Sequence, residues 1–150
     1  MVTRAKTSTQ QACRVLLVDD NRSGMMARRS VLEELGYKTE GTTNPLKALD
    51  MFRKEPYDLV VTDYKMPELD GVELIGKLRA EMPGIPVILI SGFVDALGLN
   101  EKNTGANSVI MKSANEVQHL VRSASRLLKT PRKPVRSEGG ATAARKKAAN

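Results

Sequence analysis

The sequence is poor in the residue types that build several common kinds of functional site. Its 150 residues include one cysteine, one histidine and no tryptophan, and aromatic residues make up only 3%. The lone Cys13 cannot form an internal disulfide or a cysteine-based zinc site, and His119 alone cannot form a histidine cluster. So few aromatic side chains are also poor material for stacking nucleic-acid bases. These absences exclude a disulfide-stapled fold and a zinc module built on cysteine or on several histidines.

Long hydrophobic runs are absent as well. No apolar run approaches the roughly 18 residues that a membrane-spanning helix needs. Residues 1–11 are polar and lack the apolar centre of a secretory signal. We therefore expect a cytoplasmic protein with no membrane partner. The proportions of hydrophobic residues (41%) and charged residues (27%) are typical of a soluble globular domain.

The net charge of +7 belongs to the two ends of the chain. Met1 to Cys13 contains no acidic residue, and Lys129 to Asn150 contains seven basic residues and one acidic residue, Glu138. The C-terminal composition, rich in Pro, Gly, Ala, Lys and Arg, cannot bury enough apolar surface to offset the entropy of ordering. We predict disordered segments at 1–12 and 130–150 around one domain at 13–129. The only nucleic-acid contact that we expect is weak binding through the basic tail.

Between these ends, short apolar runs alternate with stretches of helical spacing. The apolar runs predict five buried parallel strands, at Arg14–Val18, Tyr37–Thr42, Leu59–Thr62, Val87–Ile90 and Ser108–Met111. Helical spacing follows each run, at Ser23–Leu35, from Pro45 to before Pro56, at Gly71–Glu81, at Asp95–Lys102 (weakened by Gly98) and at 116–128. Ser113 and Glu116 match a capping box for the last helix. This alternation predicts an α/β fold with a doubly wound five-stranded parallel sheet.

Polar residues close four of the five predicted strands. The first strand is followed by Asp19 and Asp20, the third by Asp63, the fourth by Ser91 and the fifth by Lys112. Taken singly, such residues often only cap helices or form turns. Because ligands of parallel sheets bind beyond the carboxyl ends of the strands, we expect these five side chains to converge.

Three converging carboxylates have chemical consequences. They repel one another and raise one another's pKa unless a cation lies between them, and oxygen ligands around an open site favour Mg²⁺ over zinc or copper. Mg²⁺ and a lysine can together hold the charge that a transferring phosphoryl group spreads over its oxygens. The sequence therefore predicts phosphoryl chemistry, with one of the carboxylates as nucleophile.

Two stretches resemble those of a known family. Leu16 to Asn21 (Leu-Leu-Val-Asp-Asp-Asn) resembles the start of a two-component response-regulator receiver domain. Asp63 to Gly71 is similar to that family's phosphoacceptor loop, Asp-x-x-Met-Pro-x-x-Asp/Asn-Gly, and Ser91 and Lys112 fall in the two remaining places. The resemblance covers Arg14 to Leu128 and is to single-domain receivers like the chemotaxis regulator. It implies a flavodoxin-like (βα)5 fold with strand order 2-1-3-4-5.

The resemblance also implies a role for each residue. Asp63 would be the phosphoacceptor, Lys112 would pair with its carboxylate and then with the phosphoryl oxygens, and Ser91 would move toward the phosphoryl group. The implied Mg²⁺ ligands are Asp20 and Asp63 directly, Asp19 through a water, and the backbone carbonyl of Lys65.

The implied function is a phosphorylation-activated signalling switch of a two-component or phosphorelay system. A sensor histidine kinase or a histidine phosphotransfer protein would phosphorylate Asp63 from a phospho-histidine. The surface made by the fourth helix (95–102), fifth strand (108–111) and fifth helix (116–128) would then change its binding to a downstream protein target. Such a protein catalyses only its own phosphorylation and dephosphorylation.

Two positions depart from the family pattern. Val109 stands where the family usually has Tyr or Phe, and Phe93 is the candidate to replace that aromatic side chain. Lys112-Ser113 replaces the family's Lys-Pro with its usual cis bond, and a cis bond before a residue other than proline costs about 2.5–4 kcal/mol. We therefore predict a trans bond between Lys112 and Ser113.

Three alternatives stay open on the sequence alone. The chain could be the receiver fragment of a larger hybrid kinase or regulator. It could be a phosphatase that works through an aspartyl-phosphate, although that class usually has Asp-x-Asp after the first strand and Asp19 and Asp20 are adjacent. The segment Lys129–Asn150 could be a nucleic-acid arm, or simply a solubilising tail.

Overall fold

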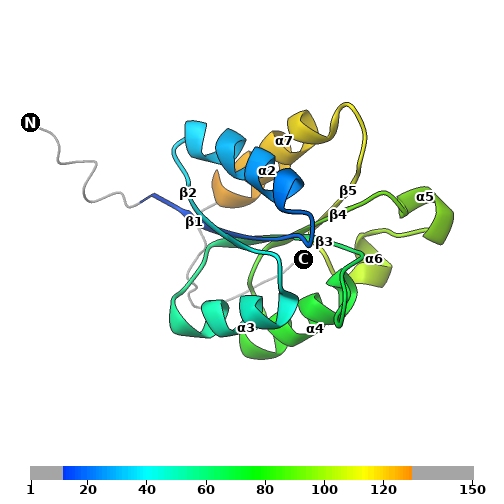
Figure 1. The fold of residues 1–150 in the computed structure, drawn as a ribbon, viewed down its shortest axis with the longest axis horizontal. Coiled ribbons are helices and arrows are strands. Elements are labelled where there is room, and N and C mark those ends of the chain that lie inside the picture. Colours follow the sequence, from blue (N-terminus) through cyan, green and yellow to red (C-terminus); the bar gives the residue numbers. More distant parts are fainter. Residues whose placement is uncertain (1–11, 130–150) are drawn as a thin grey trace, which may run out of the picture.

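The computed structural model describes residues 12–129, and Figure 1 shows them as a parallel sheet between two layers of helices. The strands are β1 (Arg14–Val18), β2 (Lys38–Thr42), β3 (Leu59–Asp63), β4 (Val87–Ser91) and β5 (Ser108–Met111). They are hydrogen-bonded in the order β2-β1-β3-β4-β5, and every neighbouring pair is parallel. The predicted fold class and strand order are therefore confirmed.

Six helices complete the described part of the chain. They are α2 (Arg22–Glu34), α3 (Pro45–Lys54), α4 (Gly71–Glu81), α5 (Val94–Leu97), α6 (Glu101–Thr104) and α7 (Glu116–Lys129). None of these helices is both long enough and apolar enough to cross a membrane. Residues 1–11 and 130–150 lie outside the described range, so the expected disorder of the two ends and the domain limits 13–129 stay predictions.

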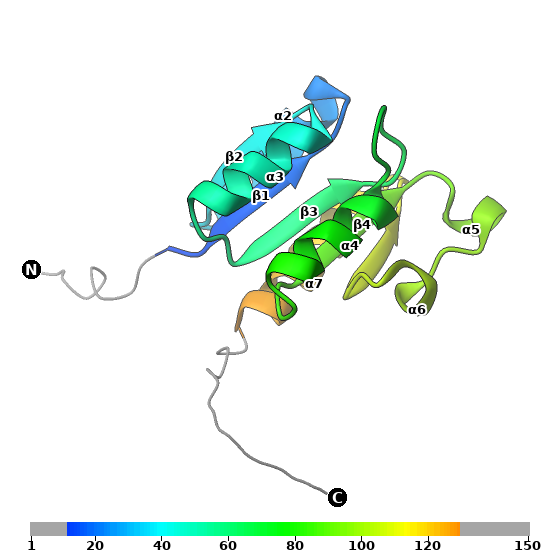
Figure 2. The same cartoon turned by 90° about the horizontal axis from the view of Figure 1, so that it is seen from below.

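The sheet is covered on both faces. Helices α2 and α7 lie on one face, and α3 and α4 lie on the other (Figures 1 and 2). Because successive side chains of a strand point to opposite faces, Val15 and Leu17 of β1 enter the core under α2 and α7, whereas Leu16 and Val18 enter the core under α3 and α4. Burial on both faces explains why the strands read as continuous apolar runs in the sequence.

Side chains that cap helices set where three of the long helices begin. Asn21 precedes α2 and accepts a hydrogen bond from the N–H of Gly24, and Asn44 precedes α3, in which Pro45 takes the first helical position. Asp70 precedes α4 and forms a capping box with Glu73. These caps hold the loops that follow β1, β2 and β3 at one edge of the sheet, where the polar residues of the sequence analysis lie.

The single helix expected at Asp95–Lys102 is wrong. The segment forms two one-turn helices, α5 and α6, because Gly98 adopts a left-handed conformation (φ 62°) that ends α5. Asn100 then starts α6 through its own capping box with Asn103. The carboxylate of Glu101, in α6, accepts a hydrogen bond of 3.2 Å from the N–H of Val109 on the edge strand β5.

Candidate functional site

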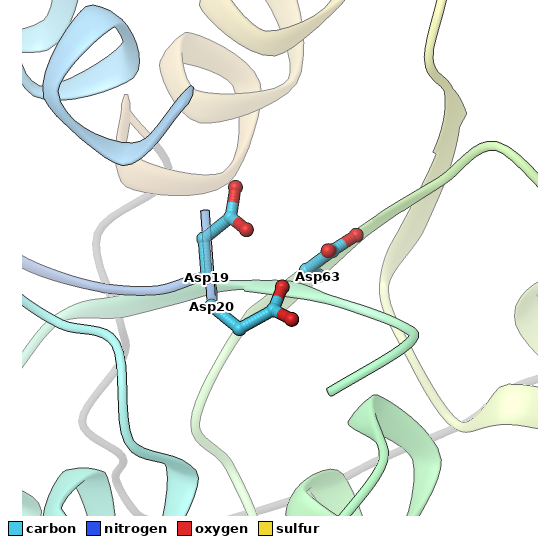
Figure 3. Close-up of side chains that lie close together, drawn as sticks. All are labelled: Asp19, Asp20 and Asp63. Carbon is cyan, nitrogen blue, oxygen red and sulfur yellow. The ribbon is translucent and has the colours of Figure 1, made fainter. Parts of the chain in front are cut away.

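Three carboxylates meet at the carboxyl ends of β1 and β3. Asp19 and Asp20 follow β1 directly, and Asp63 is the last residue of β3, which pairs with β1 in parallel so that both strands end at the same level. One oxygen from each carboxylate can be chosen so that all three lie within 4.8 Å of one another. Figure 3 shows the three side chains close together beyond the ends of the two strands. We call these three residues the acidic pocket.

The three carboxylates differ in their exposure to water. Asp19 and Asp63 are 1% and 4% exposed, whereas Asp20 is exposed. Burial raises the pKa of Asp63, and the negative charge of Asp19 raises it further, while Lys112 and the N–H of Tyr64 act in the opposite direction. The buried pair thus lies in surroundings where a cation would be strongly favoured.

Lys112 reaches Asp63 from across the sheet. It follows β5, two strands away from β3, and its Nζ lies 3.1 Å from Oδ1 and 3.2 Å from Oδ2 of Asp63. The Lys112–Ser113 bond is trans, as predicted. Lys112 therefore contacts the Asp63 carboxylate without the family's proline, and its role in phosphoryl transfer stays a prediction.

Ser91 lies on the strand between those two residues. It is the last residue of β4 and is buried. Its hydroxyl oxygen accepts a hydrogen bond of 2.8 Å from the N–H of Phe93, so in this state the hydroxyl stabilises the turn that leads into α5.

The loop from Asp63 to α4 is fixed by a close approach at Gly71. The N–H of Gly71 donates to the carbonyl of Tyr64 at 2.7 Å. A Cβ atom added at Gly71 would lie 2.5 Å from the backbone oxygen of Asp63 and 3.0 Å from the Cα atom of Tyr64. Only glycine fits at this position without movement of the backbone that carries Asp63.

The two residues linked to the family's missing aromatic side chain occupy different surroundings. Val109 is partly buried against the core under α3 and α4. Phe93 is partly exposed, and the Nζ of Lys65 lies 5.3 Å from the centre of its ring.

A cavity of about 420 Å³ lies beside the acidic pocket. It is lined by Phe93, Lys65, Tyr64, Met66, Asp70 and Leu97. The ligand role of the Lys65 carbonyl and the switching role of Phe93 stay predictions.

One charged residue of this site, Arg28, was not predicted from the sequence. Its guanidinium, on α2, donates from Nη1 to Oδ2 of Asp19 and from Nε to Oε2 of Glu116 at 2.6 Å. Burial by itself would lower the pKa of Arg28, but the hydrogen bonds and charges of Glu116 and Asp19 raise it, so the group stays charged. Arg28 occupies the buried face of α2 together with Met25 and Leu32, and this spacing of three and four residues was the signal available in the sequence.

The capping box expected for the last helix is wrong, because Arg28 engages the side chain of Glu116. The Glu116 side chain binds Arg28 and does not turn back to the N–H of residue 113. Ser113 instead accepts a hydrogen bond of 3.1 Å from the N–H of Asn115, which makes a local turn before α7. The attraction of a buried guanidinium thus outweighs the local cap.

The charges joined to the acidic pocket do not balance. Within residues 12–129, the ion pairs link Asp19, Asp63 and Glu116 to Arg28 and Lys112, and Asp20 adds a further carboxylate. The excess of two negative charges equals the charge of one divalent cation. All three donors of the pocket are carboxylate oxygens, a set that suits Mg²⁺.

Comparison with known proteins agrees with this chemistry. The model of the response regulator receiver domain family matches residues 15–124, and the chain belongs to this family. Membership makes the matched part a phosphorylation-activated switch of two-component signalling. Receiver domains are generally signalling switches and not enzymes that turn over a separate substrate.

Two curated relatives are similar to this chain over part of its length. Over 120 residues the chain is 32% identical to the sensor histidine kinase GacS of Pseudomonas protegens, an alignment that covers 75% of this chain and 13% of the kinase. Over 81 residues it is 38% identical to the polar-differentiation response regulator DivK of Brucella anthropi, which covers 53% of this chain and 66% of DivK. The chain thus spans less than two thirds of the length of either relative.

A solved structure that shares this fold was determined with a bound metal ion. The response regulator TrrA of Thermotoga maritima, determined in complex with Mg²⁺-BeF, superposes with a TM-score of 0.69 at 28% identity. The superposition covers 77% of this chain and 98% of TrrA.

Proposed function

We propose that this chain is a switch in which Asp63 accepts a phosphoryl group from the phospho-histidine of a sensor histidine kinase or a histidine phosphotransfer protein. The observation that carries the proposal is the meeting of three carboxylates from two strands with Lys112 bound to one of them. Asp19 and Asp63 are both buried, but Asp63 is the one that contacts Lys112 and begins the loop that resembles the family's phosphoacceptor loop.

The transfer itself follows from the placement of these groups. A carboxylate oxygen of Asp63 forms the new bond to phosphorus while the bond from phosphorus to the histidine nitrogen breaks, and the departing imidazole takes up a proton. Asp19, Asp20, Asp63 and the carbonyl of Lys65 would hold Mg²⁺, which when bound neutralises charge on the phosphoryl oxygens. Lys112 then exchanges its contact with the carboxylate for one with those oxygens.

The response of the surface would start at Ser91. A phosphoryl group adds about −1.5 to −2 charge and three strong acceptors, which the Ser91 hydroxyl and Lys112 can contact only after transfer. When the hydroxyl turns toward the phosphoryl group, the N–H of Phe93 at the start of α5 loses its partner. Contacts that exist in one state only are what shifts a two-state equilibrium, so the region of α5, α6, β5 and α7 would change its binding to a downstream protein.

The proposed protein catalyses only its own phosphorylation and dephosphorylation. The coverage of 13% of GacS supports a second possibility, that the chain corresponds to the receiver part of a larger kinase or regulator. The aspartyl-phosphate phosphatase is less well supported, because that class usually has Asp-x-Asp after the first strand, whereas Asp19 and Asp20 are adjacent.

Incubation with acetyl phosphate and Mg²⁺, followed by intact mass, tests the proposal. We expect one added phosphoryl group on the wild type and on Asp50→Asn, a control with an exposed carboxyl in α3, and none on Asp63→Asn. Chelation of Mg²⁺ should abolish the labelling. Labelling of Asp63→Asn at the wild-type level would overturn the proposal, and multiple turnover of a small phosphomonoester would favour the phosphatase instead.

A further inference from the structure

We infer that Arg28 is a positioning residue that transmits the occupancy of the metal site to the first turn of α7. This inference rests on the proposed Mg²⁺ site. It concerns a second route out of the acidic pocket, on the face of the sheet covered by α2 and α7 and separate from the route through Ser91 and α5.

The geometry of the link is a single guanidinium shared between two carboxylates. Arg28 donates from Nη1 to Asp19, a member of the acidic pocket, and from Nε to Glu116, the first residue of α7. Asp19 and Arg28 are nine residues apart, whereas Arg28 and Glu116 are 88 residues apart, so the contact joins two helices that lie side by side in Figure 1. A change in the interaction between Asp19 and the guanidinium therefore alters the contact between Arg28 and the first residue of α7.

Both oxygens of the Asp19 carboxylate accept a hydrogen bond in the structure. Its Oδ1 accepts a hydrogen bond of 2.9 Å from the N–H of Asn21, and its Oδ2 accepts the bond from Arg28. A divalent cation in the acidic pocket attracts the Asp19 carboxylate, directly or through a water, and repels the guanidinium. The pair between Arg28 and Asp19 must weaken when the metal binds.

The guanidinium cannot respond by losing its charge or by moving into water. Arginine keeps its proton at any ordinary pH, and Arg28 is only 5% exposed. A buried cation requires a carboxylate partner, and Glu116 is the partner that the metal does not compete for. Metal binding should therefore move Arg28 toward Glu116 and shift the first turn of α7.

With this arrangement, metal binding and phosphorylation would each change a different surface of the domain. The presence of the metal would be read on the face formed by α2 and α7, through Arg28. Phosphorylation would be read at α5, through Ser91 and Phe93. A partner that contacts α2 and α7 could thus distinguish the metal-loaded protein before any phosphoryl transfer.

The test is a titration with MgCl₂ monitored by NMR. The signals recorded are the amide chemical shifts of Glu116 and Val117 and the Nε–H resonance of Arg28. In the wild type we expect all three to shift with one common Kd. In Glu116→Gln the pair between Arg28 and Asp19 is retained, so Mg²⁺ should still bind, but the shifts of residues 116 and 117 should fall to less than about a third of the wild-type values.

Variants of Arg28 supply the second measurement. Arg28→Met removes one positive charge beside the metal site, so we expect Mg²⁺ to bind about tenfold more tightly and α7 no longer to respond. Arg28→Lys keeps the charge and should restore a Kd within about threefold of the wild type. Arg29→Met is the matched control, because the Arg29 guanidinium contacts Thr39 and Glu33 and not the pocket.

The outcomes separate this inference from the proposed function. If the wild type binds no Mg²⁺, both are overturned. If Mg²⁺ binds but residues 116 and 117 shift equally in the wild type and in Glu116→Gln, only the role of Arg28 is overturned. Weaker Mg²⁺ binding by a folded Arg28→Met would likewise show that the residue merely supports the pocket. Since Glu116→Gln keeps the buried arginine paired, the test stands even if Arg28→Met fails to fold.

Discussion

The two ends of the parallel sheet carry similar charged side chains but differ in how much water reaches them. At the amino end, Arg14 binds Glu55 at 2.7 Å and Glu40 at 3.5 Å, and these two glutamate side chains are 61% and 51% exposed. At the carboxyl end, Asp19 and Asp63 are buried and are held by Arg28 and Lys112. Each end also borders a cavity, of about 380 Å³ and about 420 Å³ respectively.

The comparison shows that neither an ion pair nor a cavity marks a functional site by itself. Water screens the charges around Arg14, so their pairing contributes little and needs no further cation. Around Asp63 the same chemistry is desolvated, and the excess negative charge favours the binding of a divalent cation. Four changes, ordered by expected effect, would break or sharpen this contrast.

Removal of the positively charged side chain at the carboxyl end should slow the phosphorylation of Asp63, whereas its removal at the amino end should not. Lys112→Ala should slow phosphorylation of Asp63 by acetyl phosphate about 10²–10³-fold, because the developing charge loses its positioned partner. Arg14→Ala should leave the rate within about twofold. The rates are measured by intact mass at matched Mg²⁺ concentration, and equal rates for the two variants would remove the distinction between the ends.

A methyl group added at each end should likewise have unequal effects on stability. Gly71→Ala places a Cβ 2.5 Å from the backbone oxygen of Asp63, and such overpacking costs about 1–3 kcal/mol. Gly84, in the turn before β4 at the amino end, has open space where a Cβ would lie, so Gly84→Ala should leave the stability unchanged or raise it slightly. Urea unfolding of the two variants decides, and a Gly71→Ala protein as stable as the wild type would contradict the close approach.

The buried carboxyl should make the stability of the Mg²⁺-free protein depend on pH. The pKa of Asp63 is raised above its ordinary value of 3.8, so from about pH 4 upward the unfolded state loses its proton first and the folded state retains it. The free energy of unfolding should therefore fall as the pH rises through this window, and level off above the folded pKa. In Asp63→Asn this fall should be smaller, whereas Asp50→Asn should behave as the wild type. Urea midpoints between pH 4 and pH 8 give the slopes.

The smallest effect is expected at the exposed pair of the amino end. Glu55→Gln removes the 2.7 Å contact with Arg14 but should change the free energy of unfolding by no more than about 1 kcal/mol. The difference should shrink further in 1 M salt, where screening is nearly complete. A larger loss that persisted in salt would show that the amino end depends on its charges as strongly as the carboxyl end.

Local pattern was sufficient to predict the sheet and the side chains that close its strands. Runs such as Leu59–Thr62 are short, apolar and followed by a polar residue, so the strand and the position of Asp63 at its end follow from neighbouring residues alone. The strand order, which brings Asp63 beside Asp19, was predicted from the family resemblance and not from local pattern.

The rest depended on contacts that no local pattern contains. Arg28 and Glu116 meet across 88 residues. The spacing of Arg28 with Met25 and Leu32 indicates a buried position but not its partner, and Glu116 has an ordinary local interpretation as part of a helix cap. The break between α5 and α6 was missed because a glycine in a helical pattern is often tolerated, and only the left-handed backbone at Gly98 together with the cap at Asn100 ends the helix.

The contact between Glu101 and the N–H of Val109 has a consequence for how the molecule meets other chains. β5 is an outer strand, and the free backbone groups of such a strand can pair with a strand from another molecule and start aggregation. An incoming strand would have to displace the Glu101 carboxylate before it could use that N–H. The short helix that replaced part of an expected longer one thus shields the margin of the sheet against unwanted association.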